Sequence, residues 1–115
     1  ILKPNQILLS LSSLDFSFIL ENHISEVFKM LHEYKLKVNL IQSSAISFTV
    51  CVSDIYNNFD KLLEVLQKQF RVKYNTNVDL FTVRHFTADT EQEVAGDREI
   101  LVGQQSRETL QLVVR

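Results

Sequence analysis

The stretch VNLIQSSAISFTVCV (residues 38–52) places hydrogen-bonding side chains at the corner between two apolar runs. Asn39 and Gln42 carry amides, and Ser43 and Ser44 carry hydroxyls, so each side chain can both donate and accept hydrogen bonds. Hairpin turns usually rely on glycine, asparagine or aspartate, and this turn has none of them. Two interpretations follow: ordinary polar residues of a strand and its turn, or one wall of a site for a small polar molecule.

The sequence shows no motif for catalysis or metal binding. Gly96 and Gly103 are the only glycines, whereas the phosphate-binding loops of kinases and dinucleotide-binding proteins need several. The histidines His23, His32 and His85 stand far apart, and no second ligand lies at metal-binding spacing. We therefore expect no catalytic residue, metal site or cofactor within this sequence.

The composition predicts a globular protein with one domain, or with one small domain and part of a second. The sequence has 115 residues, of which 45% are hydrophobic and 23% are charged, and its net charge is −2. This charge argues against a nucleic-acid partner, and no apolar run reaches the about 20 residues that span a membrane. A single cysteine and a first segment without signal-peptide features lead us to expect an internal or C-terminal piece of a cytoplasmic protein.

The spacing of apolar residues predicts the order β-α-β-β-α-β between residues 6 and 75. The expected elements are a strand at 7–13, a helix at 23–35 capped by Asn22, two strands on either side of the turn at 42–45, a helix at 59–70 and a strand at 71–75. Ile46, Phe48, Val50 and Val52 alternate with small residues, so we expect them to face the helices. This order is typical of the α+β ferredoxin-like fold, an antiparallel sheet with both helices on one face.

The remaining residues predict a shortened version of the same unit. Strands are expected at 78–86, 100–106 and 108–115, and the polar, acidic segment 87–99 is expected to be a linker without a helix. The predicted domains are therefore 1–77, with the complete β-α-β-β-α-β order, and 78–115, with the order β-linker-β-β. Because three strands without helical cover leave apolar surface bare, the second domain should pack on the first or on a partner chain.

Several segments of the sequence resemble the C-terminal regulatory region of aspartate kinases, which consists of ACT domains. In the first domain these segments are LLSLSS (8–13), SEVFKML (25–31), KVNLIQSS (37–44) and ISFTVCV (46–52). In the second they are FRVKYNTNVDLFTV (70–83), which begins in the first domain, and ILVGQQSRETLQLVV (100–114). The resemblance implies a ferredoxin-like ACT domain followed by an abbreviated second ACT-like unit.

The resemblance also implies a function. Aspartate kinase transfers a phosphoryl group from ATP to L-aspartate, giving 4-phospho-L-aspartate for amino-acid biosynthesis, including lysine biosynthesis. Its kinase domain, with Mg-ATP, performs this transferase reaction, and its ACT domains bind an end product and bring about allosteric feedback inhibition. We therefore expect an amino-acid effector, with lysine favoured over threonine, a homodimer formed through the ACT domains, and a kinase domain in the same chain.

The resemblance further implies that the effector binds between two segments that face each other across the dimer interface. The first segment follows the first strand and comprises Ser13, Leu14, Asp15, Phe16, Ser17, Phe18 and Ile19. The second comprises Val38, Asn39, Gln42, Ser43 and Ser44. A free amino acid is a zwitterion, and backbone groups, amides and hydroxyls supply its donors and acceptors without an unpaired buried charge.

Other functions of the same fold are less well supported by the sequence. An ACT-like module could hold subunits together without binding any metabolite, and this alternative stays open. An acylphosphatase-type enzyme would need an arginine in a phosphate-binding loop after the first strand, where SSLDFSF (12–18) has an acid. An RNA-binding sheet would need exposed aromatic residues with basic neighbours on its central strands, and the sequence predicts none there.

Overall fold

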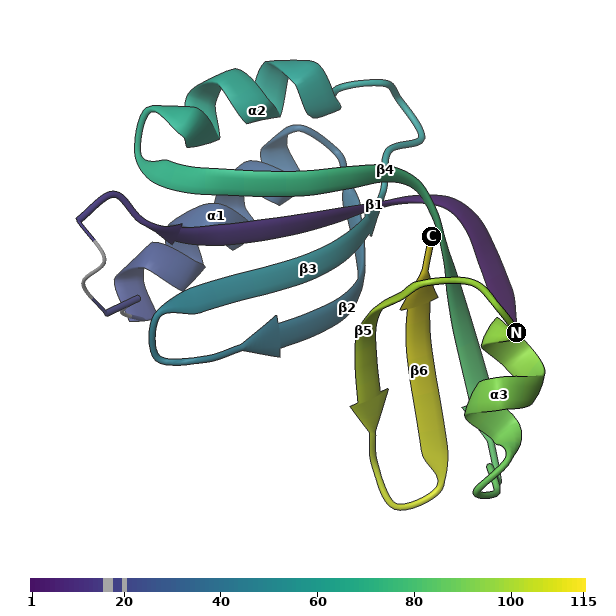
Figure 1. Cartoon of the computed structure of the whole chain (residues 1–115). Helices are drawn as coiled ribbons and strands as arrows, with labels where there is room; N and C mark the ends of the chain where they lie inside the picture. Colours follow the sequence, from purple (N-terminus) through teal and green to yellow (C-terminus); the bar gives the residue numbers. More distant parts are fainter. Residues whose placement is uncertain (16–17, 20) are drawn as a thin grey trace. The chain divides into compact units, whose positions relative to one another are not determined.

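The computed structural model in Figure 1 describes residues 1–15, 18–19 and 21–115. Its elements are β1 (Leu2–Ser13), α1 (Glu21–Glu33), β2 (Lys37–Ser43), β3 (Ser47–Ser53), α2 (Phe59–Gln67), β4 (Phe70–Arg84), α3 (Thr90–Ala95), β5 (Ile100–Gln105) and β6 (Thr109–Val114). The strands follow the order β2-β3-β1-β4-β6-β5 in the sheet.

The chain divides into two compact units. We call residues 7–75 the first unit, and residues 1–6 together with 76–115 the second unit. The long strands β1 and β4 each contribute one end to each unit. The predicted domain boundaries, 1–77 and 78–115, assign residues 1–6 to the first domain instead.

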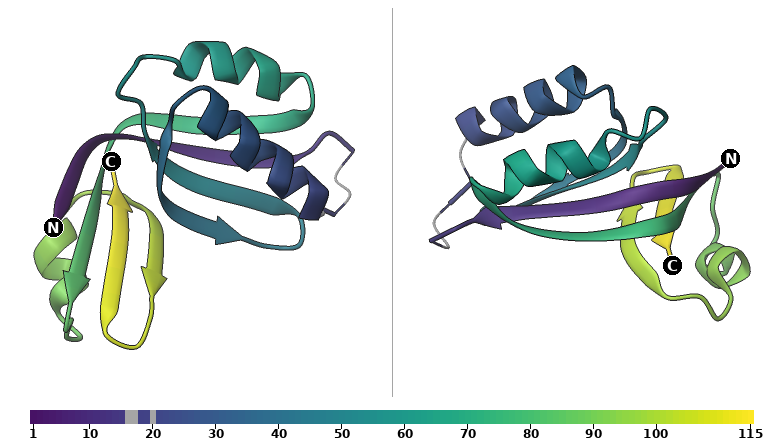
Figure 2. Two further views of the ribbon diagram at one scale, coloured as in Figure 1. Left: turned by 180° about the vertical axis from the view of Figure 1, so that it is seen from behind. Right: turned by 90° about the horizontal axis from the view of Figure 1, so that it is seen from above.

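The first unit confirms the predicted ferredoxin-like order. Its strands lie in the order β2-β3-β1-β4, and α1 and α2 cover the same face of this sheet (Figure 2). β3 runs antiparallel to both of its neighbours, with Leu9 opposite Val50 and Leu11 opposite Phe48. Because strand side chains alternate between faces, these four residues all point toward the helices.

The core of the first unit lies between that face and the two helices. The residues that fill it are Ile7, Leu9, Leu11, Val27, Leu31, Leu36, Phe48, Val50, Val52, Phe59, Leu62, Leu66 and Phe70. Burying each of the leucines contributes about 2 kcal/mol to folding, so this packing fixes where the loops at the ends of the strands lie. Asp54 holds the start of α2, since its carboxylate accepts hydrogen bonds from the amides of Asn58 (2.8 Å) and Phe59 (3.0 Å).

Three local predictions for the first unit were wrong. Ile46 is 58% exposed because β3 begins only at Ser47, which leaves Ile46 in the turn. Asn22 lies inside α1 and is not its cap, because the helix begins at Glu21. The turn is also shorter than predicted, since β2 continues through Gln42 and Ser43.

Two predictions for the second half of the chain were also wrong. The expected strands at 71–75 and 78–86 are one strand, β4, because polar residues around Asn77 interrupt the apolar pattern without ending the strand. Asn77 has a positive φ of 55°, a conformation that asparagine tolerates better than most residues. The expected linker contains the short helix α3, where the buried Thr90 accepts a hydrogen bond from the amide of Thr87 (2.7 Å). A buried threonine does not register as part of an apolar helical pattern.

The second unit has four strands, because the first residues of the chain supply one of them. Ile1 and Thr82 exchange two hydrogen bonds of 2.8 Å between their main-chain groups, on the side of β4 away from β6. The resulting order, β1-β4-β6-β5, corresponds to the order β4-β1-β3-β2 of the first unit. The helix α3 of the second unit is shorter than α1, which has the corresponding place in the first unit.

The hairpin β5–β6 repeats the hairpin β2–β3 residue by residue. A β-bulge lies between Val38 and Leu40 in one hairpin and between Ile100 and Val102 in the other. Each turn is closed by the same hydrogen bond, from Ser44 N to Ser47 O and from Ser106 N to Thr109 O, both 2.9 Å long. The two units therefore share one backbone design, although their side chains differ.

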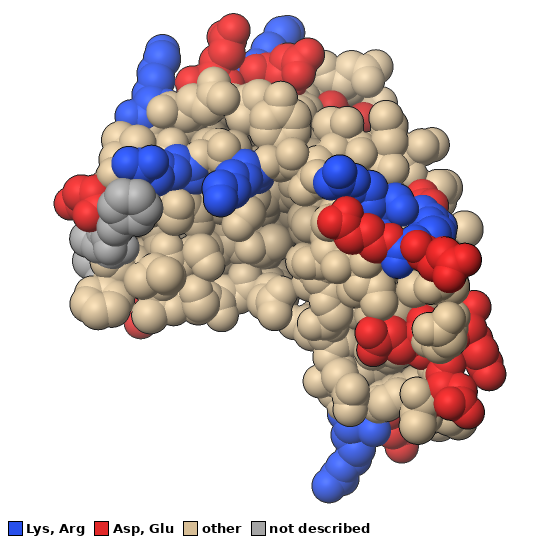
Figure 3. All heavy atoms as spheres, in the orientation of Figure 1, with Lys and Arg blue, Asp and Glu red and all other residues tan. Residues whose placement is uncertain are grey.

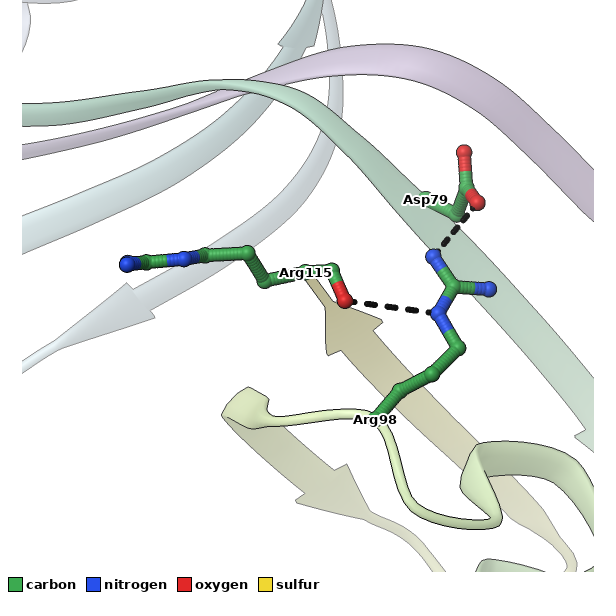
Figure 4. Close-up of polar contacts among 3 residues, drawn as sticks. All are labelled: Asp79, Arg98 and Arg115. Carbon is green, nitrogen blue, oxygen red and sulfur yellow. Dashed lines mark hydrogen bonds and ion pairs between the residues drawn. The ribbon is translucent and has the colours of Figure 1, made fainter.

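Arg98 links three segments of the second unit (Figure 4). Its guanidinium donates to the carboxylate of Asp79 on β4 (2.7 Å) and to the main-chain oxygen of Arg115 after β6 (3.4 Å). It also lies 5.9 Å from the ring centre of Phe81. Arg98 thus connects the segment after α3 with two neighbouring strands.

Replacing Arg98 by alanine should lower the free energy of unfolding of the second unit by about 1 kcal/mol. The effect is modest because solvent screens the pair: the side chains of Arg98 and Asp79 are 39% and 24% exposed. Chemical denaturation measures the change. The matched control is Arg107→Ala, since Arg107 is exposed and makes no ion pair in the described part of the chain. Equal losses of stability in the two variants would contradict the role of Arg98.

Candidate functional site

The end of β1 opens onto a hollow in the first unit, with a volume of about 580 Å³. It is lined by Ser13, Leu14, Asp15, Asn22, His23, Glu26, Gln69 and Phe70. These residues bring together a hydroxyl, two carboxylates, an imidazole and two amides, beside the buried ring of Phe70. The hollow can therefore offer hydrogen-bond acceptors to an ammonium group and donors to a carboxylate.

Three of the predicted site residues, Ser13, Leu14 and Asp15, belong to this hollow. Ser13 is buried at the end of β1, and Leu14 and Asp15 form an exposed turn. The main-chain oxygen of Leu14 accepts a hydrogen bond from Arg71 Nε (3.2 Å), which ties this turn to the start of β4. The predicted residues Phe16 and Ser17 lie outside the described residues.

The sequence interpretation missed the residues of the hollow that come from α1 and from the start of β4. His23 lies edge-on to the ring of Phe70, with 6.1 Å between ring centres. Asn22, His23 and Glu26 lie near the loop after β1 because α1 begins at Glu21. Placing the start of the predicted helix two residues earlier would have indicated this proximity. Gln69 and Phe70 carry no such signal, because only the pairing of β1 with β4 brings them to this place.

The end of the predicted loop contacts the turn between β2 and β3. The amide of Ile19 donates a hydrogen bond to the main-chain oxygen of Ala45 (2.9 Å), and the Ile19 side chain packs against the core. Phe18, one position earlier, is 65% exposed. The structure therefore places part of the first predicted segment beside the turn that follows Gln42, Ser43 and Ser44.

Ser44 has a structural contact within this turn. Its hydroxyl lies 2.9 Å from that of Ser47 and accepts a hydrogen bond from the Ser47 amide (3.2 Å). Serine thus closes a turn that usually relies on glycine or asparagine. Gln42 and Ser43 are exposed at the end of β2, where Gln42 lies opposite Thr49 and Ser43 opposite Phe48.

Val38 and Asn39 lie at the opposite end of β2. Asn39 is the extra residue of the β-bulge, next to the row in which Leu40, Cys51 and Leu8 are paired. Ser13 is five residues farther along β1 than Leu8, which corresponds to roughly 17 Å of strand. One free amino acid cannot reach from Asn39 to the loop after β1 of the same chain.

Asn39 has a defined partner on the neighbouring strand. Its Nδ2 donates a hydrogen bond to the hydroxyl of Ser53 (2.8 Å), and both side chains are half-buried. Val38 instead packs against the core with its apolar side chain. Ser53 did not feature in the sequence interpretation, because a bulge that brings it near Asn39 cannot be read from apolar alternation.

Comparison with solved structures places the fold among those of aspartate kinases. Aspartokinase III of Escherichia coli, in complex with lysine and aspartate, matches 98% of this chain with a TM-score of 0.73 and 22% identity. A putative C-terminal regulatory domain of aspartate kinase from Porphyromonas gingivalis matches all of it, with a TM-score of 0.78 and 13% identity. The aspartate kinase of Clostridium acetobutylicum matches 99%, with a TM-score of 0.77 and 15% identity.

The chain has the ACT-domain fold of an aspartate kinase regulatory region. It spans 28% of the E. coli enzyme and 30% of the C. acetobutylicum enzyme, but 84% of the P. gingivalis regulatory domain. No protein-family model and no curated protein matches the sequence significantly. The likeness therefore concerns the fold of a regulatory region within longer enzymes.

None of the helices described here is long and apolar enough to cross a membrane. In the same part of the chain, no three histidine, cysteine, aspartate or glutamate side chains gather in an arrangement that could hold a metal ion.

Proposed function

We propose that this chain is the amino-acid-sensing regulatory region of an aspartate kinase. It binds an end product of the aspartate pathway, lysine in preference to threonine, and thereby inhibits a kinase domain in the same cytoplasmic protein. The observation that carries the proposal is the fold. Along 98% of the chain, it matches the fold of an aspartokinase solved with lysine and aspartate. Phosphoryl transfer and Mg-ATP binding are assigned to the kinase domain.

The separation of Asn39 from the loop after β1 supports a site shared by two copies of the chain. β2 is the edge strand of the first unit, so its outer side can pair with another strand. Antiparallel pairing of two β2 strands about a two-fold axis near Ile41 would place Asn39 of one chain opposite Ser43 of the other. The loop and turn of one chain then approach the Asn39 end of its neighbour.

The charge pattern of this edge also favours self-association. Residues 38–43 contain no charged side chain, and the surface over β2 at the lower margin of the first unit is mostly uncharged (Figure 3). Ile41 is 43% exposed there. Edge strands that must not associate usually carry charges or proline, and this part of β2 has neither.

The proposed chemistry of recognition follows from the groups at the two ends of β2. Backbone amides of the loop and the hydroxyls near the turn can donate to the effector carboxylate, and amide and carboxylate oxygens can accept from its ammonium groups. An effector that bridges two chains stabilises one arrangement of the dimer. It transmits a signal only because it binds that arrangement more tightly than the alternatives.

A thermal-shift screen tests the proposed function. The protein is heated with lysine, threonine or methionine, alone and in pairs, and with glycine as the control zwitterion. At about 100 times the dissociation constant, the true effector should add about 2.7 kcal/mol of stability and raise the melting temperature by several degrees. A stable dimer by light scattering that responds to none of these amino acids would contradict the sensing function and favour an assembly module.

A further inference from the structure

The hairpins β2–β3 and β5–β6 have the same backbone and can be compared residue by residue. The bulge of the first unit contains Asn39, and the matching bulge of the second unit contains Leu101. The partner of Asn39 is Ser53, and the residue at the matching position is Arg115. Because the same bulge forms with leucine, the hydrogen bond between Asn39 and Ser53 is not required by the backbone.

The second unit uses the same place on the hairpin for a different contact. Arg115 donates its amide to the main-chain oxygen of Glu99 (2.9 Å), and its side chain lies 3.7 Å from the Glu99 carboxylate. In the first unit, Lys37 stands opposite Ser53, and Ser53 accepts from Asn39. The amide–hydroxyl pair is thus specific to the unit that carries the proposed effector site.

A side-chain amide can rotate about two bonds, and fixing it costs conformational entropy when it binds a ligand. The 2.8 Å hydrogen bond to Ser53 fixes the Asn39 amide across the hairpin before any ligand arrives. Ser53 is itself held in the regular strand β3, whose neighbours Val52 and Cys51 are fully buried. The Asn39 amide is therefore hydrogen-bonded to a rigid part of the sheet.

We propose that Ser53 is a positioning residue that holds the Asn39 carboxamide in the orientation in which it contacts the bound amino acid. This inference rests on the proposed function and adds to it a specific residue that the ligand itself need not touch. Its consequence is that the affinity for the effector depends on the hydroxyl of Ser53.

Titration calorimetry with the amino acid selected by the screen tests the inference. Ser53→Ala should raise the dissociation constant about five- to tenfold, the loss expected for one hydrogen bond. Ser53→Thr keeps the hydroxyl and should restore affinity to nearly the wild-type value. The matched control is Ser10→Ala, which removes another hydroxyl of the same sheet, bonded to Thr49 at 3.0 Å, and should leave affinity unchanged.

A double-mutant cycle separates positioning from a general loss of stability. In an Asn39→Ala background, Ser53→Ala should cause no further loss of affinity, because the amide that it positions is gone. Ser53→Val repeats the test if the alanine variant does not fold. A Ser53→Ala protein that binds like the wild type would overturn the inference and leave the proposed function intact. A wild-type protein that binds no amino acid overturns both.

Discussion

Replacing Ile41 by lysine should turn the dimer into a monomer and abolish binding of the effector. In the proposed two-fold pairing, Ile41 of one chain lies opposite Ile41 of the other, so the variant places two like charges face to face. We expect the dimer to dissociate at least about a hundredfold more readily, which corresponds to about 3 kcal/mol. The fold should persist, because Ile41 is 43% exposed and the lysine head group can reach solvent.

Analytical ultracentrifugation and titration calorimetry on the same samples measure the two effects. The matched control is Ile55→Lys, which makes the same substitution at an isoleucine of the first unit that is 68% exposed and lies outside the strands. The control should remain a dimer and bind normally. An Ile41→Lys protein that is monomeric yet binds the effector with full affinity would show that the site lies within one chain.

Changing Asn39 to aspartate should alter which amino acid is bound. If the Asn39 end of the site receives the side-chain ammonium of lysine, the new carboxylate should raise the affinity for lysine about tenfold. The affinity for threonine should fall, because its carboxylate is repelled by the added negative charge and its neutral hydroxyl forms no ion pair with it. The gain for lysine should shrink at high salt, since salt screens the new ion pair.

Competition titrations at low and high salt measure this change. Asn57→Asp is the matched control, because it adds the same charge to an exposed loop of the first unit. The backbone at Asn57 has a φ of 57°, a conformation that both asparagine and aspartate adopt. It should change neither affinity. Equal behaviour of the two variants would contradict a contact between Asn39 and the effector.

The first unit could be predicted from the sequence because its apolar periods are regular. Phe48, Val50 and Val52 alternate as a half-buried strand must, and the helix residues Phe59, Leu62 and Leu66 recur at helical spacing. Each pattern reflects burial of one face. Ile46 continues the alternation by one residue, and the turn removes it from the sheet.

The second unit was harder to predict because its cohesion comes from distant parts of the chain. No local pattern indicates that Ile1 pairs with Thr82, and that pairing supplies the fourth strand. The helix α3 contains six residues and buries a threonine, so its apolar period is too short to recognise. Long-range pairing of strands is the part of a fold that sequence spacing alone leaves open.

The candidate site was likewise predictable in its local segments and not in their arrangement. The loop after β1 and the turn after β2 were predicted as two segments, and the hydrogen bond from Ile19 to Ala45 brings them together in one chain. Asn39 stands only three residues before Gln42 in the sequence, yet the bulge turns it toward Ser53 at the far end of the strand. The sequence suggested the types of group at the site, and the strand register determines how they are distributed over it.

Titration calorimetry of the wild-type protein with lysine, threonine and methionine tests the central claim most directly. We predict saturable binding of one of these amino acids, with about one molecule bound per chain of the dimer, and loss of that binding in the Ile41→Lys variant. A dimeric wild-type protein that releases or absorbs no heat with any of the three, at temperatures on either side of 25 °C and with no thermal shift, would contradict an amino-acid sensor.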